Sequence, residues 1–208
     1  MIDLKPLRDR LLRKLGERDV IIKRHKELQN EYIDLKELCS YVKEAQRIAQ
    51  LVAENTLAFF EGHINNVVTL SLHFVFENPY DFKCKFVRRR NQTECDLTFV
   101  RNGTERKPTE ASGIGAVDVA AFALRVALWS LESEQKRNLF ILDEPFKHLR
   151  GKENQRKASA MVRELATDLG LQIIMVADVS FNIEADKRFH FDLINDVSTL
   201  TEEEGTAE

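Results

Sequence analysis

Two carboxylates follow a short apolar run in the second half of the chain. The run from Leu139 to Leu142 is too short for a surface helix and predicts a buried parallel strand, after which Asp143 and Glu144 stand at its carboxyl end. In open α/β sheets ligands bind at that edge, where acidic groups can meet a metal ion and a phosphate. The alternative is a core strand followed by a solvated acidic turn, because short motifs often arise by chance.

A serine and two glycines precede a second apolar segment. Ser112, Gly113 and Gly115 come just before or at the start of residues 113–131, which are apolar nearly all round and predict a helix buried on most faces. Unpaired N–H groups and a hydroxyl at a helix N-terminus can bind an anion. The alternative is an ordinary N-cap, in which Ser112 caps the helix and the glycines loosen the loop.

The elements around these residues alternate. After the 139–142 strand, residues 152–169 predict a helix closed by Gly170, a glycine placed to act as a C-cap. Residues 171–177 predict a second buried strand, which ends at Asp178. Strand, helix and strand in this order imply a right-handed crossover and parallel pairing.

The first 60 residues form the first predicted domain, a long helix. Apolar residues recur every seven positions at Leu28, Leu35, Val42 and Ala49, with others three residues later, which is a heptad seam of a coiled coil. The alternative is an amphipathic helix lying on its own domain, although about fifty residues is far above the globular average.

The second predicted domain is 61–200, and 201–208 predict an acidic disordered tail. Within the domain, alternating residues predict strands at 68–76, 82–86 and 94–101, which form an antiparallel meander with a turn at Asn102-Gly103. A further strand is expected at 186–191. The run Arg88, Arg89 and Arg90 could contact a DNA phosphate backbone, or it could be a solvated strand end.

Composition limits the class of protein. The 208 residues carry a net charge of −3, so nucleic-acid contact would need a local patch. The three cysteines form no CxxC pair, which argues against a disulfide framework or zinc site and favours a cytoplasmic location. No signal peptide and no run of membrane-spanning length is present, so no membrane partner is expected.

In their order, these motifs resemble the C-terminal half of an ABC-type ATPase head of the structural-maintenance-of-chromosomes (SMC) class. ASGIG with the following AVDVAAFALRVALWSL resembles the signature motif and its helix, and ILDEPF resembles the Walker B strand. FKHLR stands at the position of the D-loop, and LQIIMVAD at the position of the switch strand. The likeness is greatest to the ATPase subunit of double-strand-break repair nucleases and to phage recombination-nuclease large subunits. The implied fold is α/β, an ABC-ATPase-like C-terminal lobe with a parallel sheet, helices and an antiparallel meander, preceded by a long coiled-coil helix.

The resemblance implies a task for each site residue. Asp143 would hold Mg²⁺, and Glu144 would act on the water that attacks the γ-phosphate of ATP. Ser112, Gly113 and Gly115 would contact the nucleotide held by a second, facing head, and Asp178 stands at the switch position. Implied partners are that second head, a nuclease subunit and DNA.

The sequence also departs from the family. It contains no GxxxxGK[ST] phosphate-binding loop, so we expect an ATPase half-site that hydrolyses ATP only with an N-terminal half supplied in trans. Ile114, Arg150 and Asp178 replace the family's second signature glycine, D-loop aspartate and switch histidine. The alternatives are a non-catalytic pseudo-ATPase lobe or a coiled-coil partner subunit without a nucleotide role.

Overall fold

The structure, a computed structural model, describes residues 4–90, 92–111, 113–132, 137–178, 181, 183–194 and 197–204. The chain divides into two compact units, Met1–Thr56 and Leu57–Glu208. The first helix, α1 (Lys5–Val75), contributes to both. None of the helices in the described part of the chain is long and apolar enough to cross a membrane.

The first unit is the N-terminal part of α1, and each described residue up to Thr56 is exposed. The seam residues are among them: Leu28 is 48% exposed, Leu35 53% and Val42 57%. The long helix is therefore confirmed. Pairing of its heptad seam with a second helix stays a prediction, because these seam residues are exposed in the single chain.

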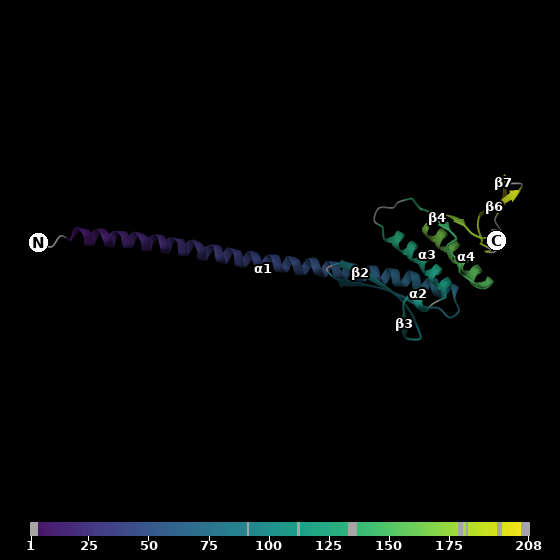
Figure 1. Ribbon diagram of the computed structural model, residues 1–208, viewed down its shortest axis with the longest axis horizontal. Helices are drawn as coiled ribbons and strands as arrows, with labels where there is room; N and C mark the ends of the chain where they lie inside the picture. The colour runs from purple at the N-terminus through teal and green to yellow at the C-terminus, as the bar shows by residue number, and fades with distance from the viewer. Residues whose placement is uncertain are drawn as a thin grey trace. The chain divides into compact units, whose positions relative to one another are not determined.

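The predicted strand at 68–76 is wrong, since α1 continues to Val75 (Figure 1). The buried residues Ile64, Val68, Leu72 and Val75 are spaced by four, four and three positions, which is one face of a helix. The other apolar residues that suggested alternation point outward: Leu70 is 69% exposed and Phe74 44%.

Three antiparallel strands follow: β1 (Asp81–Arg89), β2 (Gln92–Arg101) and β3 (Thr104–Arg106), paired in that order. The predicted antiparallel meander is therefore present, but its first strand is β1 and not the predicted 68–76 strand. Its third strand is the short β3. The predicted turn is confirmed: Asn102 has φ 52° and Gly103 φ 74°, and both positive values suit a two-residue hairpin loop of type I′.

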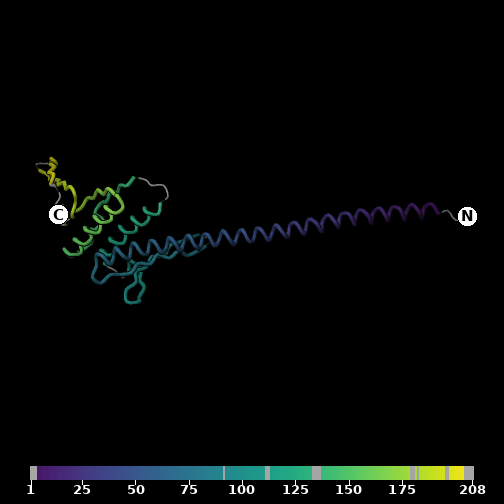
Figure 2. The backbone as a smooth tube through the Cα atoms, turned by 180° about the vertical axis from the view of Figure 1, so that it is seen from behind, coloured from purple at the N-terminus to yellow at the C-terminus, as the bar shows by residue number. Residues whose placement is uncertain are grey.

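The outer edge of β1 is bonded to side chains of α1, which runs beside the hairpin (Figure 2). Asn65 accepts a hydrogen bond from the Cys84 N–H at 2.6 Å, and Thr69 accepts one from the Phe82 N–H at 2.9 Å. Glu61, one helical turn earlier, accepts the Phe86 N–H at 2.5 Å. Three acceptors four residues apart on a helix thus satisfy alternate donors of an edge strand.

We expect Asn65→Leu to lower the free energy of unfolding by about 1–2 kcal/mol, because the partly buried Cys84 N–H loses its acceptor. Denaturant titration of the variant measures this. Asn66→Leu, an exposed neighbour, is the matched control and should stay within about 0.5 kcal/mol of the parent. Equal stability of the two variants would contradict the edge-capping role.

The parallel part of the fold agrees with the prediction. After the short helix α2 (Pro108–Ala111) come α3 (Ile114–Leu131), β4 (Leu139–Asp143), α4 (Lys152–Leu169) and β5 (Gln172–Val176), with β4 and β5 parallel. Gly170 ends α4 in the left-handed conformation at φ 62°. α3 and α4 lie side by side (Figure 1) and share one core with α1 and the hairpin.

The last two strands form a separate antiparallel pair, β6 (Lys187–Ile194) and β7 (Val197–Glu204). The strand predicted at 186–191 is thus present and longer. The disordered tail predicted at 201–208 is wrong for Thr201–Glu204, which belong to β7, whereas 205–208 lie outside the described residues. Cross-strand contacts accompany this extension: Glu202 lies 2.9 Å from Lys187, and Glu203 lies 3.2 Å from His190 Nε2.

Candidate functional site

The acidic residues predicted to do chemistry come together at one edge of the parallel sheet. Asp143 is the last residue of β4 and is paired in register with Val176, and Asp178 lies two residues beyond Val176. The Glu144 N–H donates to the Val176 carbonyl at 2.8 Å, which ties the start of the turn to the neighbouring strand. Asp143, Glu144 and Asp178 therefore share the carboxyl edge.

Glu144 has φ 41°, in the left-handed region that non-glycine residues seldom adopt. The turn after it is anchored by Phe146, which is 3% exposed and packs against Phe122 of α3 and Phe181. Strained backbone that is fixed by its surroundings is common at functional sites. Here it holds the Glu144 carboxylate in position at the strand end.

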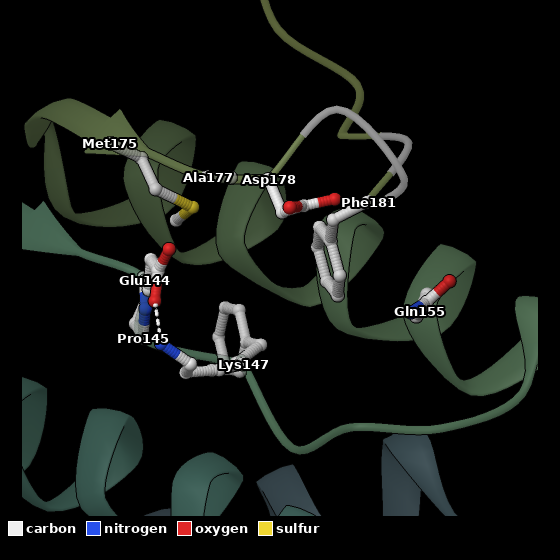
Figure 3. Close-up of a pocket in the computed structure, with 9 residues that line it drawn as sticks. Glu144, Pro145, Lys147, Gln155, Met175, Ala177, Asp178 and Phe181 are labelled. Atoms are coloured by element: carbon white, nitrogen blue, oxygen red, sulfur yellow. Dashed lines mark hydrogen bonds and ion pairs between the residues drawn. The ribbon is translucent and has the colours of Figure 1, made fainter.

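A pocket of about 260 Å³ lies at this edge. Figure 3 shows Glu144 and Lys147 joined by an ion pair, with Asp178 and Phe181 across from them. The other residues that line it are Pro145, Phe146, Gln155, Met175 and Ala177. Its walls thus combine two carboxylates and one cation with two aromatic side chains and a thioether.

Lys147 is the residue that sequence reasoning missed. Its Nζ lies 2.6 Å from Glu144 Oε2, and the hydrogen bond to Glu144 raises the pKa of Lys147, as do the charges of Glu144, Asp143 and Asp178. The available signal was its spacing of three residues from Glu144 in the turn that follows β4. A cation therefore stands among three carboxylates, which offsets part of their repulsion for a phosphate.

The signature-like loop lies against the segment that follows the turn. A side-chain carbon on Gly115 would lie 3.0 Å from the His148 carbonyl oxygen and 3.1 Å from Leu149 Cα, so a larger residue would fit only if this segment moved away by a few tenths of an ångström. Asp118 on α3 also accepts the His148 N–H at 2.9 Å. The D-loop-like segment is thus held against the first turns of α3.

Gly113 is the N-cap of α3, with open space around its Cα and no side-chain cap. A glycine at this position cannot cap the N–H groups of the first turn with a side chain of its own. Ser112, the third predicted residue of this site, lies outside the described residues.

The three arginines predicted as a DNA contact lie at the tip of the β1–β2 hairpin. Arg89 is held by Asp96 at 2.6 Å and Glu94 at 3.1 Å, and these carboxylates raise its pKa. Arg90 sits in the turn at φ 47°. Two acidic neighbours thus offset the Arg89 charge, and the run offers less net positive charge than its sequence suggests.

The residues at the sheet edge fit a magnesium ion only in part. Among the described residues no group of three or more His, Cys, Asp or Glu side chains could enclose a metal ion. Mg²⁺ in nucleotide sites is usually held by one or two carboxylates, phosphate oxygens and water. Asp143 has the chemistry of one such ligand, and the phosphate oxygens would have to come from a nucleotide.

Comparison with solved structures identifies the fold. The chain is similar to an Smc head bound to the C-winged helix domain of ScpA, with a TM-score of 0.52 at 13% identity over 69% of this chain and 43% of that one. It is similar to an SMC ATPase from work on ATP-driven dimerization and DNA-stimulated activation, with a TM-score of 0.53 at 14% identity over 72% of this chain and 88% of that one.

A third similar structure includes coiled coil. It is the Smc head of Pyrococcus furiosus with an extended coiled coil, bound to the C-terminal domain of ScpA, with a TM-score of 0.57 at 14% identity over 94% of this chain and 48% of that one. This chain thus spans about half of two of these three proteins. No protein-family model and no curated protein matches the sequence. The fold is that of an SMC head, as the motif order predicted.

Proposed function

We propose that this chain is the C-terminal half of a DNA repair or recombination ATPase head, which hydrolyses ATP together with an N-terminal half supplied in trans. The observation that carries the proposal is the β4–β5 sheet, whose carboxyl edge bears Asp143, Glu144 and Asp178 and whose one face is bare. The likeness to SMC heads supports it, since an SMC ATPase in that comparison undergoes ATP-driven dimerization.

The bare face of this sheet argues that a second lobe completes it. Phe140, Leu142, Ile173 and Met175 point into the core, whereas on the other face Ile141 is 73% exposed, Ile174 49% and Val176 59%. Parallel sheets are normally covered on both faces. In the described part of the chain the parallel sheet has only two strands. A second lobe would therefore both extend the sheet with further strands and cover its exposed face, and it would carry the phosphate-binding loop.

In the completed site each residue would have one task. Asp143 would ligate Mg²⁺, which neutralises phosphate charge, and Glu144 would orient the attacking water and accept its proton. The first turn of α3, with Ser112, Gly113 and Gly115, would contact the nucleotide of a second head. ATP would thereby join two heads, and hydrolysis would release them.

The experiment is reconstitution. The purified chain is mixed with the product of a neighbouring gene that encodes GxxxxGK[ST] and heptads able to pair with residues 28–52, and ATP turnover is measured. We expect the chain alone to be inactive and the mixture to be active with Mg²⁺. Co-purification without ATP turnover would overturn the catalytic part of the proposal.

Lys147→Met should weaken ATP-dependent association of the reconstituted heads about 10-fold or more, because the phosphates then meet the carboxylates of Asp143 and Glu144 without the Lys147 charge. Lys147→Arg, which keeps the charge, should restore most of it. The ion pair is exposed, so the stability of the chain alone should change little. Sedimentation with a slowly hydrolysed ATP analogue measures the association; equal values for Met and Arg would contradict the role.

A second candidate function is a pseudo-ATPase lobe whose signature loop serves the ATP of a partner. It is favoured by Asp178 and Arg150, which replace the family's switch histidine and D-loop aspartate. This candidate predicts that the reconstituted mixture binds ATP at one site and that substitution of Glu144 has no effect on turnover. A nuclease subunit as partner, and DNA contact at Arg88 and Arg90, remain part of the proposal.

A further inference from the structure

The two cysteines of the β1–β2 hairpin lie next to each other. Their Sγ atoms are 2.9 Å apart and both are free thiols. Cys84 is paired in register with Leu97 and Cys95 with Phe86, so the two thiols are diagonal neighbours on one face of the hairpin. Cys84 is 3% exposed, whereas Cys95 is exposed. A buried thiol and an accessible thiol are thus in contact.

The backbone around this pair is held from both sides. The Cys84 and Phe86 N–H groups donate to Asn65 and Glu61 of α1, away from β2. Their pairs across the hairpin are therefore the non-hydrogen-bonded kind, in which cross-strand side chains approach most closely. The two thiols face each other because of the strand register and not because of a flexible loop.

We propose that Cys84 and Cys95 form a site of reversible thiol oxidation, with a low-molecular-weight disulfide as the oxidant and an intramolecular disulfide as the product. The Cys95 thiolate attacks one sulfur of the small disulfide, forms a mixed disulfide and releases one small thiolate. Cys84, after losing its proton to water, attacks Cys95 Sγ and releases the second small thiolate. Two protein thiols are oxidised and one small disulfide is reduced to two thiols.

The environment assigns the order of these steps. Burial raises the pKa of Cys84 to about 12, as do the hydrogen bond and charge of Cys95 and the charge of Glu61. Cys84 is therefore protonated and enclosed, and an oxidant from solution meets Cys95 first. Contact between the sulfurs then favours closure over release of Cys95. The inference does not depend on any nucleotide role of the chain.

The test uses the purified full chain with oxidised glutathione, followed by intact mass and peptide mapping. Cleavage after Lys85 and Arg90 separates the two cysteines, so a linked peptide reports the disulfide. Cys39, exposed and without a neighbouring cysteine in the described residues, is the internal control and should carry glutathione. We expect loss of two hydrogen atoms at Cys84 and Cys95, reversal by reducing agent, and a rise in Tm of several degrees.

Two variants distinguish disulfide formation between Cys84 and Cys95 from the ordinary reaction of an exposed thiol with glutathione. In Cys84→Ala, the mixed disulfide at Cys95 should persist, because the resolving thiol is gone. In Cys95→Ala, Cys84 should stay reduced, because it is buried. The proposal is overturned if the parent chain carries glutathione at Cys95 with Cys84 still reduced, or if neither reacts under conditions in which Cys39 is fully modified.

Discussion

Glu144→Gln is expected to lower ATP turnover by the reconstituted head at least about 100-fold while ATP-dependent association of the heads persists. A positioned general base contributes about 10²- to 10⁴-fold to a rate, and glutamine has the same shape without the ability to accept the proton. Because hydrolysis separates the heads, its loss should prolong the ATP-bound state. Single-turnover kinetics and size-exclusion chromatography of the same sample measure both effects.

The structure indicates that Glu144→Gln should leave the stability of the chain unchanged. The Glu144 side chain is 37% exposed and its ion pair with Lys147 is exposed, so the pair contributes little to stability. The positive φ at position 144 is no more costly for glutamine than for glutamate. Loss of turnover therefore cannot be attributed to unfolding, which thermal denaturation of the variant would confirm.

Two control variants locate the effect. Asp143→Asn should weaken Mg²⁺-dependent nucleotide binding, which Glu144→Gln should leave intact. Glu153→Gln removes another glutamate, which pairs with Arg156 on the exposed side of α4, and should change neither turnover nor association. Undiminished turnover by Glu144→Gln would disprove its role as base and favour the pseudo-ATPase alternative.

The parts of the fold that were predictable have strong local signals. The β4 run is uniformly apolar and short, and Gly170 occupies the left-handed C-cap position of α4. Such residues favour one structure whatever surrounds them. The carboxylates at the sheet edge followed from parallel pairing alone, because that topology places both strand ends together.

The failures arose where distant residues decide the structure. The segment around Val68 to Phe74 alternates apolar and polar residues by coincidence, and its helical state follows from burial of one face against the core. Arg89 was predicted as an available cation, but strand register brings Asp96 and Glu94 to it. The role of Lys147 depends on Asp178, which a separate strand delivers.

The second large effect is expected at the bare sheet face. Ile141→Lys should weaken binding of the N-terminal half at least about 100-fold, because the lysine would be enclosed in the interface without a partner charge. The chain alone should keep its stability within about 0.5 kcal/mol, since Ile141 is 73% exposed there. Analytical ultracentrifugation of the mixture and denaturant titration of the single chain measure the two quantities.

A matched control makes the result specific to this face. Leu70→Lys introduces the same charge at an apolar residue of the same unit, 69% exposed on α1, and should leave assembly unchanged. If Ile141→Lys assembles as the parent does, the bare face is not where the second lobe binds. If both variants fail, loss of apolar surface in general is responsible. Only selective failure of Ile141→Lys supports a lobe that covers the sheet and brings the phosphate-binding loop to Asp143 and Glu144.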